Sequence, residues 1–209
     1  RDEERLPADL LAALDRLRGE AAGRRIVMFL PTFKDGQADA YYRFTPEQVE
    51  RLGAWLERNN AVLAVREHMA DRAHTYSQML APLAPINMSS RRYPDLEVLY
   101  RAADVLISDY SSCLVDFLMT GKPVISFAYD YDAYSHKERG LFYDLEKVLP
   151  GPVCRTFDEL ADALERSFAE PSAEEREAYE WKRRIFFDHL DDGAARRVVE
   201  RVKALYGRE

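Results

Sequence analysis

Ala103-Asp-Val-Leu-Ile-Ser-Asp-Tyr-Ser-Ser-Cys-Leu-Val-Asp-Phe-Leu-Met119 is the stretch that decides the fold. Its apolar start predicts a buried strand, and the apolar spacing after Ser112 predicts a helix. A strand that ends in hydroxyl residues at a helix start can bind phosphate, because the first helical amides lack partners and the helix dipole is positive there. The stretch therefore predicts a phosphate site between a strand and a helix.

The same alternation extends through the chain. Apolar runs of strand length occupy residues 25–30, 61–65, 85–88, 105–107 and 124–127. Helical spacing covers about 6–17, 45–58, 71–83, 97–102, 111–119, 156–168, 173–187 and 193–206. Continuous apolar strands separated by helices indicate a parallel sheet covered on both faces. We therefore expect an α/β fold with a Rossmann-like parallel sheet flanked by helices.

The domain organisation follows from length and composition. The chain has 209 residues, 47% of them hydrophobic, which is enough for one domain with a packed core. We expect a leading helix and linker over 1–23, an α/β core over 24–155 and C-terminal helices over 156–209. Residues 129–140 are aromatic and polar, which predicts an ordered functional loop. Because the chain opens on Arg1 rather than Met, we expect a fragment of a larger two-domain protein.

Charge and cysteine usage argue against several classes of protein. Lys and Arg total 30 and Asp and Glu total 37, a net charge of −7, which disfavours binding to nucleic acid. No apolar stretch is long enough to span a bilayer, and the N-terminus lacks the layout of a signal peptide. Cys113 and Cys154 have no metal-type spacing. We expect reduced thiols in a cytoplasmic protein with no metal and no other cofactor.

Polar residues follow four of the expected strands and converge on one edge of the sheet. In an open parallel sheet, ligands bind beyond the carboxyl ends of the strands. His68 directly follows a buried strand, where its ring could donate to a phosphate and stabilise a leaving group. The candidate residues for binding a phosphate-bearing ligand are Thr32, Lys34, Arg66, Ser108, Asp109, Ser111, Ser112, Asp116 and Arg139.

Each candidate also has a structural interpretation. Ser111 could cap the helix that follows it, a role worth about 1 kcal/mol. The basic residues Lys34, Arg66 and Arg139 could form ion pairs with acids of the chain instead of binding phosphate. A single His such as His68 could be exposed without a role in chemistry. The residues alone leave these alternatives open.

A series of short blocks carries a resemblance to a known family. The blocks are Asp104–Ser112, Asp116-Phe117, Lys122–Ile125, Tyr129-Asp130, Tyr134, Arg139-Gly140, Leu149–Pro152 and Asp192-Gly193 with Ala195. In this order they resemble the C-terminal domain of the CDP-glycerol glycerophosphotransferases, which include teichoic-acid primases and polymerases and related capsule polymerases. The resemblance covers about residues 26–202.

The resemblance implies a GT-B architecture, in which two Rossmann-like domains face each other across a cleft and the C-terminal one holds the nucleotide-activated donor. The implied reaction moves glycerol phosphate from CDP-glycerol to a hydroxyl of a polymer or lipid-linked acceptor, releasing CMP without a required metal. It implies His68 as a catalytic residue and an acceptor base in the N-terminal domain. It further implies a protein at the inner face of the cell membrane, held there peripherally. We expect this chain alone to bind CDP or a CDP-polyol but to transfer slowly or not at all.

Two departures from the family pattern keep other functions open. Lys34 stands where the family has Arg, which loses the planar fork of a guanidinium. Met69 stands where the family has Pro after the histidine, which frees the backbone there. One alternative is a UDP-sugar-dependent glycosyltransferase or epimerase of GT-B type. Another is a non-catalytic nucleotide-binding module of a larger capsule protein.

Overall fold

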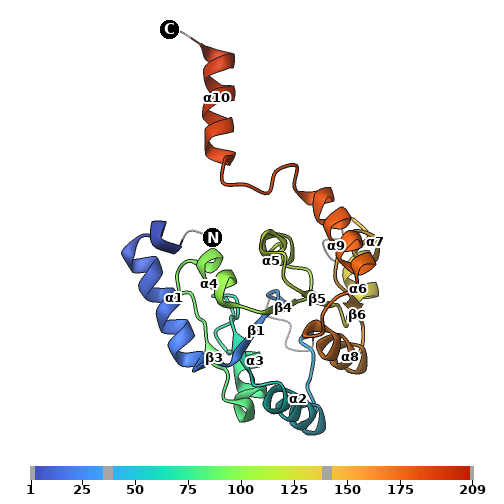
Figure 1. The fold of residues 1–209 in the computed structure, drawn as a ribbon. Helices are drawn as coiled ribbons and strands as arrows, with labels where there is room; N and C mark the ends of the chain where they lie inside the picture. Colours follow the sequence, from blue (N-terminus) through green and yellow to red (C-terminus); the bar gives the residue numbers. More distant parts are fainter. Residues whose placement is uncertain (1–2, 35–39, 138–142, 208–209) are drawn as a thin grey trace.

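One parallel sheet organises the residues that the structure, a computed structural model, describes: 3–34, 40–137 and 143–207 (Figure 1). Its six strands lie in the order β3-β2-β1-β4-β5-β6. They are β1 (Arg25–Leu30), β2 (Ala61–Val65), β3 (Ile86–Asn87), β4 (Val105–Ser108), β5 (Val124–Phe127) and β6 (Val153–Cys154). This is the strand order of the doubly wound dinucleotide-binding fold. The expected Rossmann-like sheet is confirmed, with β6 added at its edge.

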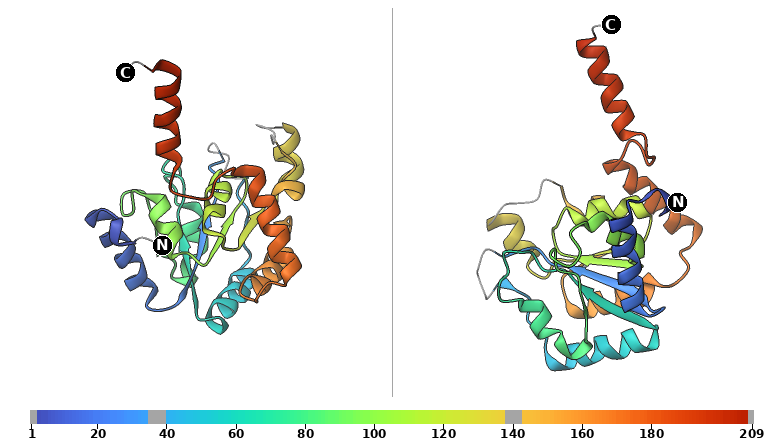
Figure 2. Two further views of the ribbon diagram at one scale, coloured as in Figure 1. Left: turned by 45° about the horizontal axis from the view of Figure 1, so that its top comes forward. Right: turned by 90° about the vertical axis from the view of Figure 1, so that its left-hand side faces the viewer.

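Helices cover both faces of the sheet (Figure 2). Alternate residues of a strand point to opposite faces, so Met28 and Phe29 belong to different layers of the core. The layer of Met28 also contains apolar residues of α1 (Ala8–Ala21), α4 (Leu96–Ala102) and α5 (Cys113–Phe117). The layer of Phe29 contains apolar residues of α2 (Pro46–Arg58), α3 (Thr75–Met79) and α8 (Phe157–Ser167). The loops that follow the strands lie at the carboxyl edge of the sheet, outside these two layers.

Capping boxes fix where three of the described helices begin. Thr45 and Gln48 form a capping box at the start of α2, and Thr156 and Glu159 form another at the start of α8. Ser172 and Glu175 do the same for α9 (Ala173–Phe186). These boxes satisfy amides that the first helical turn leaves unpaired.

Some expected elements differ from the structure in extent. The helix expected over 71–83 is divided into α3 and a 3-10 turn, Ala81–Leu83, and the one over 111–119 into α5 and a 3-10 turn, Leu118–Thr120. The segment expected as a loop contains α6 (Tyr131–Lys137), and α7 (Leu145–Val148) was not expected. α6 has no single apolar face, since Tyr134 stacks on Tyr110 whereas Tyr131 lies under Arg155. That is why a helical pattern is hard to see there.

Gly151 allows the chain to pass close against β5 before it enters β6. A Cβ at this position would lie 1.6 Å from the carbonyl oxygen of Val124. No side chain fits at that distance, so glycine is required at the turn between Pro150 and Pro152. The turn thereby brings β6 to the edge of the sheet.

The last two helices differ in how they meet the domain. α9 packs on it through Tyr179, whose hydroxyl donates to Lys122 O at 2.8 Å, and through Lys182, whose Nζ donates to Leu149 O at 2.9 Å. α10 (Ala194–Tyr206) projects away from the sheet and its covering helices (Figures 1 and 2). None of its residues is buried. Among the helices described, none is both long and apolar enough to cross a membrane.

Candidate functional site

The order of the strands places the topological switch point of the sheet at the carboxyl ends of β1 and β4. The chain leaves β1 toward β2 on one side and leaves β4 toward β5 on the other, so the two loops diverge. Leu30 pairs with Ser108, which sets the starts of both loops side by side. The stretch that predicted a phosphate site therefore lies at the switch point of the sheet.

Asp109 joins the two loops from the interior. Its Oδ1 accepts hydrogen bonds from Thr32 N at 2.9 Å, Thr32 Oγ1 at 2.5 Å and Tyr110 N at 2.8 Å. Ser108 Oγ donates to Leu30 O, and Ser126 Oγ donates to the carbonyl oxygen of Asp109 at 2.7 Å. The side chains of Ser108 and Asp109 are buried. The structure thus places Thr32, Ser108 and Asp109 together, with these polar atoms bonded within the protein.

Lys34 joins the loop after β5 to the loops after β1 and β4. Its Nζ lies 2.8 Å from Asp130 Oδ2 and 3.5 Å from Asp109 Oδ2, and its side chain is 2% exposed. The rings of Tyr110, Tyr129 and Tyr134 surround the ammonium at 4.9, 5.3 and 5.2 Å. The ion-pair interpretation of Lys34 therefore describes this structure, in which its charge faces two carboxylates and three aromatic rings.

Tyr110 completes the tie between the β4 and β5 loops. Its hydroxyl donates to Asp130 Oδ1 at 2.8 Å, and its ring stacks on Tyr134 with the centroids 3.8 Å apart. Burial, and then the carboxylate of Asp130, raise the pKa of Tyr110. The phenol therefore stays protonated and remains a donor. Together, Asp109, Lys34, Asp130 and Tyr110 fix the backbone that leads into Ser111.

Ser111 and Ser112 form the exposed end of the turn. Ser111 is half-buried, and its Oγ accepts from Cys113 N, the first amide of α5, at 3.3 Å. The N-cap position itself is Ser112, whose side chain makes no capping hydrogen bond. Ser112 is exposed. Within the described ranges, the amides of Ser111 and Ser112 have no acceptor. Asp116 is exposed on α5. Its pKa is raised, first by partial desolvation of its carboxyl group and second by the negative charge of Glu97.

Arg66 and His68 occupy the loop that follows β2. Arg66 Nη1 donates to Tyr93 O at 2.5 Å and Met88 O at 3.3 Å. Burial of the guanidinium lowers the pKa of Arg66. His68 is exposed, and its ring stacks on Phe33 with the centroids 5.5 Å apart. The remaining candidate, Arg139, lies outside the described residues.

Three residues of this edge were not among the sequence candidates. They are Asp130, which pairs with Lys34, Phe33, which stacks on His68, and Glu67, whose carboxylate binds the start of α3. Phe33 and Glu67 stand next to candidates in the chain, and that proximity is the signal that could have found them. Among the described residues, no cluster of His, Cys, Asp and Glu could hold a metal ion.

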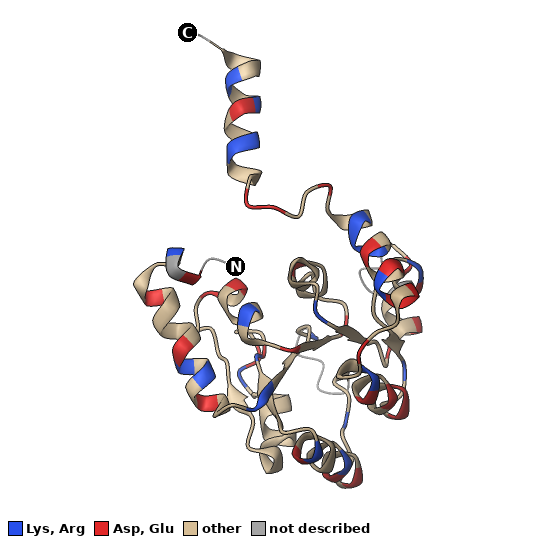
Figure 3. Cartoon of the chain, in the orientation of Figure 1, with Lys and Arg blue, Asp and Glu red and all other residues tan. Residues whose placement is uncertain are grey.

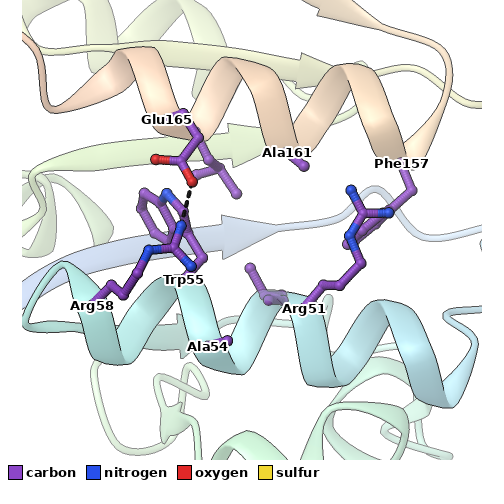
Figure 4. Close-up of a pocket in the computed structure, with 9 residues that line it drawn as sticks. Arg51, Ala54, Trp55, Arg58, Phe157, Ala161 and Glu165 are labelled. Atoms are coloured by element: carbon purple, nitrogen blue, oxygen red, sulfur yellow. Dashed lines mark hydrogen bonds and ion pairs between the residues drawn. The ribbon is translucent and has the colours of Figure 1, made fainter.

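A cavity of about 190 Å³ lies elsewhere, between α2 and α8 (Figure 4). Its lining includes Trp55, Phe157 and Leu164. Arg58 donates to Glu165 at 2.5 Å across its opening. None of the candidate residues that the structure describes lines this cavity, so it is separate from the switch point at the carboxyl edge.

The parallel sheet and its strand order define a Rossmann-like domain of the GT-B type. The structure of the wall teichoic acid polymerase TagF has the same fold, with a TM-score of 0.64 at 24% identity over 94% of this chain and 48% of that one. An α,α-trehalose 6-phosphate synthase from Burkholderia multivorans matches with a TM-score of 0.50 at 15% identity, over 96% of this chain and 50% of that one. The fold is thus that of one half of each of these structures.

The chain belongs to the CDP-glycerol:poly(glycerophosphate) glycerophosphotransferase family, whose model matches residues 6–204. A teichoic acid glycerol-phosphate transferase of Staphylococcus aureus is 30% identical over 86% of this chain and 45% of its own length. A teichoic acid poly(ribitol-phosphate) polymerase of Bacillus spizizenii is 30% identical over 86% of this chain and 28% of its own length. The chain therefore spans less than half the length of these relatives.

Proposed function

We propose that the chain is the donor-binding half of a glycerophosphotransferase. The enzyme transfers glycerol phosphate, or a similar polyol phosphate, from its CDP carrier to a hydroxyl of a teichoic-acid-like or capsular polymer. The acceptor oxygen forms a bond to the distal phosphorus, the bond from that phosphorus to the bridging oxygen breaks, and CMP leaves. The observation that carries the proposal is the Ser111-Ser112 turn at the switch point, with two amides lacking acceptors among the described residues.

The proposed roles follow from the placement of each residue. Ser111 and Ser112 donate to the donor's phosphates, and Arg66, which directly follows β2 at the same edge of the sheet, supplies positive charge. His68 donates to the leaving phosphate as negative charge develops on it. The buried Lys34 acts on the donor indirectly, by fixing the turn.

Two further roles are proposed for residues outside the part of the chain that the structure describes. Arg139 is proposed to clamp a phosphate with two guanidinium donors. The base that takes the acceptor's proton is proposed to lie in the other half of the enzyme. The donor needs no cofactor and no metal in this proposal, because positioning and hydrogen bonding neutralise the phosphates.

Calorimetry of the full-length protein with CDP-glycerol, CDP-ribitol, a UDP-sugar and CMP tests the proposed donor class. We expect the CDP-polyols and CMP to bind, and the UDP-sugar to bind at least about tenfold more weakly, since a cytidine carrier is proposed. Both polyols are included because the relatives include a glycerol-phosphate transferase and a ribitol-phosphate polymerase. A clear preference for the UDP-sugar would reject the proposal in favour of a sugar transferase or epimerase.

The same titration localises the site. Ser112→Glu should weaken CDP-polyol binding at least about tenfold, because a carboxylate at the turn repels the phosphates. Ala169→Glu is the matched control, because it adds the same charge far from the carboxyl edge. The neighbouring Phe168 ring lies under Arg25, which is at the amino end of β1. Equal affinities in the two variants would show that the phosphates bind elsewhere.

We also propose that the full-length enzyme works at the inner face of the cell membrane and is bound there peripherally. The support is α10, whose Val198, Val202, Leu205 and Tyr206 are all about half or more exposed. Its sequence also holds Arg196, Arg197, Arg201 and Lys203 against a single acid, Glu200 (Figure 3). A cationic amphipathic helix suits an anionic lipid surface.

Co-sedimentation with vesicles tests the membrane proposal. The full-length protein should bind vesicles that contain phosphatidylglycerol more tightly than vesicles of phosphatidylcholine alone. Val198→Asp together with Val202→Asp should abolish the difference, since both changes place charge on the apolar face. Equal binding of the parent protein to both kinds of vesicle would remove the proposed role of α10.

A further inference from the structure

The loop that carries His68 must be held in place by residues other than Met69. Met69, the residue after His68, is 78% exposed and so is largely unpacked. An exposed His on an unrestrained loop would sample many orientations, and a donor that must meet one phosphate oxygen needs a single orientation.

The structure shows a different restraint on the residue that precedes His68. The Glu67 side chain is 6% exposed and its Oε1 accepts from Tyr76 N at 2.6 Å and Ser77 N at 3.0 Å, at the first turn of α3. Its Oε2 accepts from Ser77 Oγ at 2.6 Å. A carboxylate with three such donors is fixed in direction, so the backbone that leads into His68 is fixed with it.

The loop is also closed on the other side of His68. Asp71 N donates to His68 O at 2.8 Å, and the carboxylate of Asp71 accepts from Ala73 N at 3.1 Å and from Thr75 N, the first residue of α3, at 3.3 Å. Asp71 is itself buried. The short span that carries His68 is therefore tied to the start of α3 by an acid before it and an acid after it.

Two contacts then set the imidazole ring itself. Ala70 N donates to His68 Nδ1 at 3.2 Å, so the neutral ring carries its proton on Nε2. The ring stacks on Phe33 with an angle of 26° between the planes. Because Nδ1 faces its own loop, the Nε2–H on the far side of the ring is the group left to meet a ligand.

We infer that Glu67 is a positioning residue for His68: by binding the start of α3, it holds the loop in which the Ala70 amide and the Phe33 ring present Nε2–H as a donor. The effect of Glu67 on the rate of transfer rests on the proposed function. Its effect on the tautomer of the His68 ring depends only on the fold. The two can be measured separately.

Nuclear magnetic resonance of full-length protein with ¹⁵N-labelled histidine tests the inference. His68 signals are assigned by their loss in His68→Gln, and at a pH where the ring is neutral they should show the Nε2–H tautomer. Glu67→Ala should give a mixture of tautomers, and it should lower kcat for CDP-polyol transfer about tenfold or more with little change in KM. Glu67→Gln keeps an acceptor oxygen for the α3 amides and should restore both readouts.

Glu159→Ala is the matched control for a purely structural loss. Its carboxylate also binds two backbone amides, of Arg155 at 2.6 Å and of Thr156 at 3.3 Å, but at the start of α8. This variant should leave the His68 tautomer and kcat unchanged. A single unchanged tautomer in Glu67→Ala, or a mixture already in the parent protein, would overturn the inference. A fixed tautomer that is lost in Glu67→Ala, in a protein without transfer activity, would support the positioning role and reject the proposed function.

Discussion

Lys34→Met is expected to lower the free energy of unfolding of the chain by about 3–5 kcal/mol. The ammonium is 2% exposed and lies 2.8 Å from Asp130 and 3.5 Å from Asp109. Methionine has a similar length and no charge, so it leaves two acids facing each other in a buried site without a cation. Urea unfolding, followed by circular dichroism, measures the loss.

Lys147→Met is the control, because it makes the same substitution in an exposed ion pair. Lys147 Nζ lies 3.1 Å from Asp144, and the two side chains are 81% and 42% exposed. Removing this pair should change stability by less than about 1 kcal/mol. If Lys34→Met lowered the free energy of unfolding no more than Lys147→Met, the ion pairs of Lys34 would not be what joins the three loops. Adding Asp130→Asn to Lys34→Met should recover part of the loss, because it removes one of the two unpaired charges.

The sheet could be predicted from the sequence because its strands are continuous apolar runs. β1, β2, β4 and β5 are buried along most of their length, and burial on both faces leaves no alternative to a parallel sheet between helices. The two-residue β6 is set instead by the close approach of Gly151 to Val124, which is a tertiary effect. α6 was missed because its tyrosines pack in different directions.

The site could be predicted only as far as local sequence determines it. The hydroxyl turn at Ser111 and Ser112 stands out because a strand ends there and a helix begins. The partner of Lys34 could not be predicted: Asp130 is 96 residues away, and several acids of the chain were equally good candidates. Burial decides between them, because among the acids that the structure describes only Asp109 and Asp130 pair with the buried Lys34.

His68→Ala is expected to reduce kcat for CDP-polyol transfer by the full-length enzyme about 10²–10³-fold. The proposed reason is that its Nε2–H donates to the leaving phosphate, where negative charge grows as the bond to the bridging oxygen breaks. Donor affinity should fall much less, by under about tenfold, because the ground-state phosphates keep their contacts at Ser111 and Ser112. Single-turnover rates and calorimetry with the same donor separate the two effects.

His189→Ala and His68→Gln show which property of His68 matters. His189 is exposed in the segment between α9 and α10 and makes none of the contacts described around Ser111 and His68, so its loss should leave both kcat and affinity unchanged. Gln at position 68 keeps a donor near the place of Nε2 and should recover part of kcat. Equal losses of rate and affinity in His68→Ala would make His68 a residue that binds the donor, because an interaction made equally in the ground and transition states does not raise kcat.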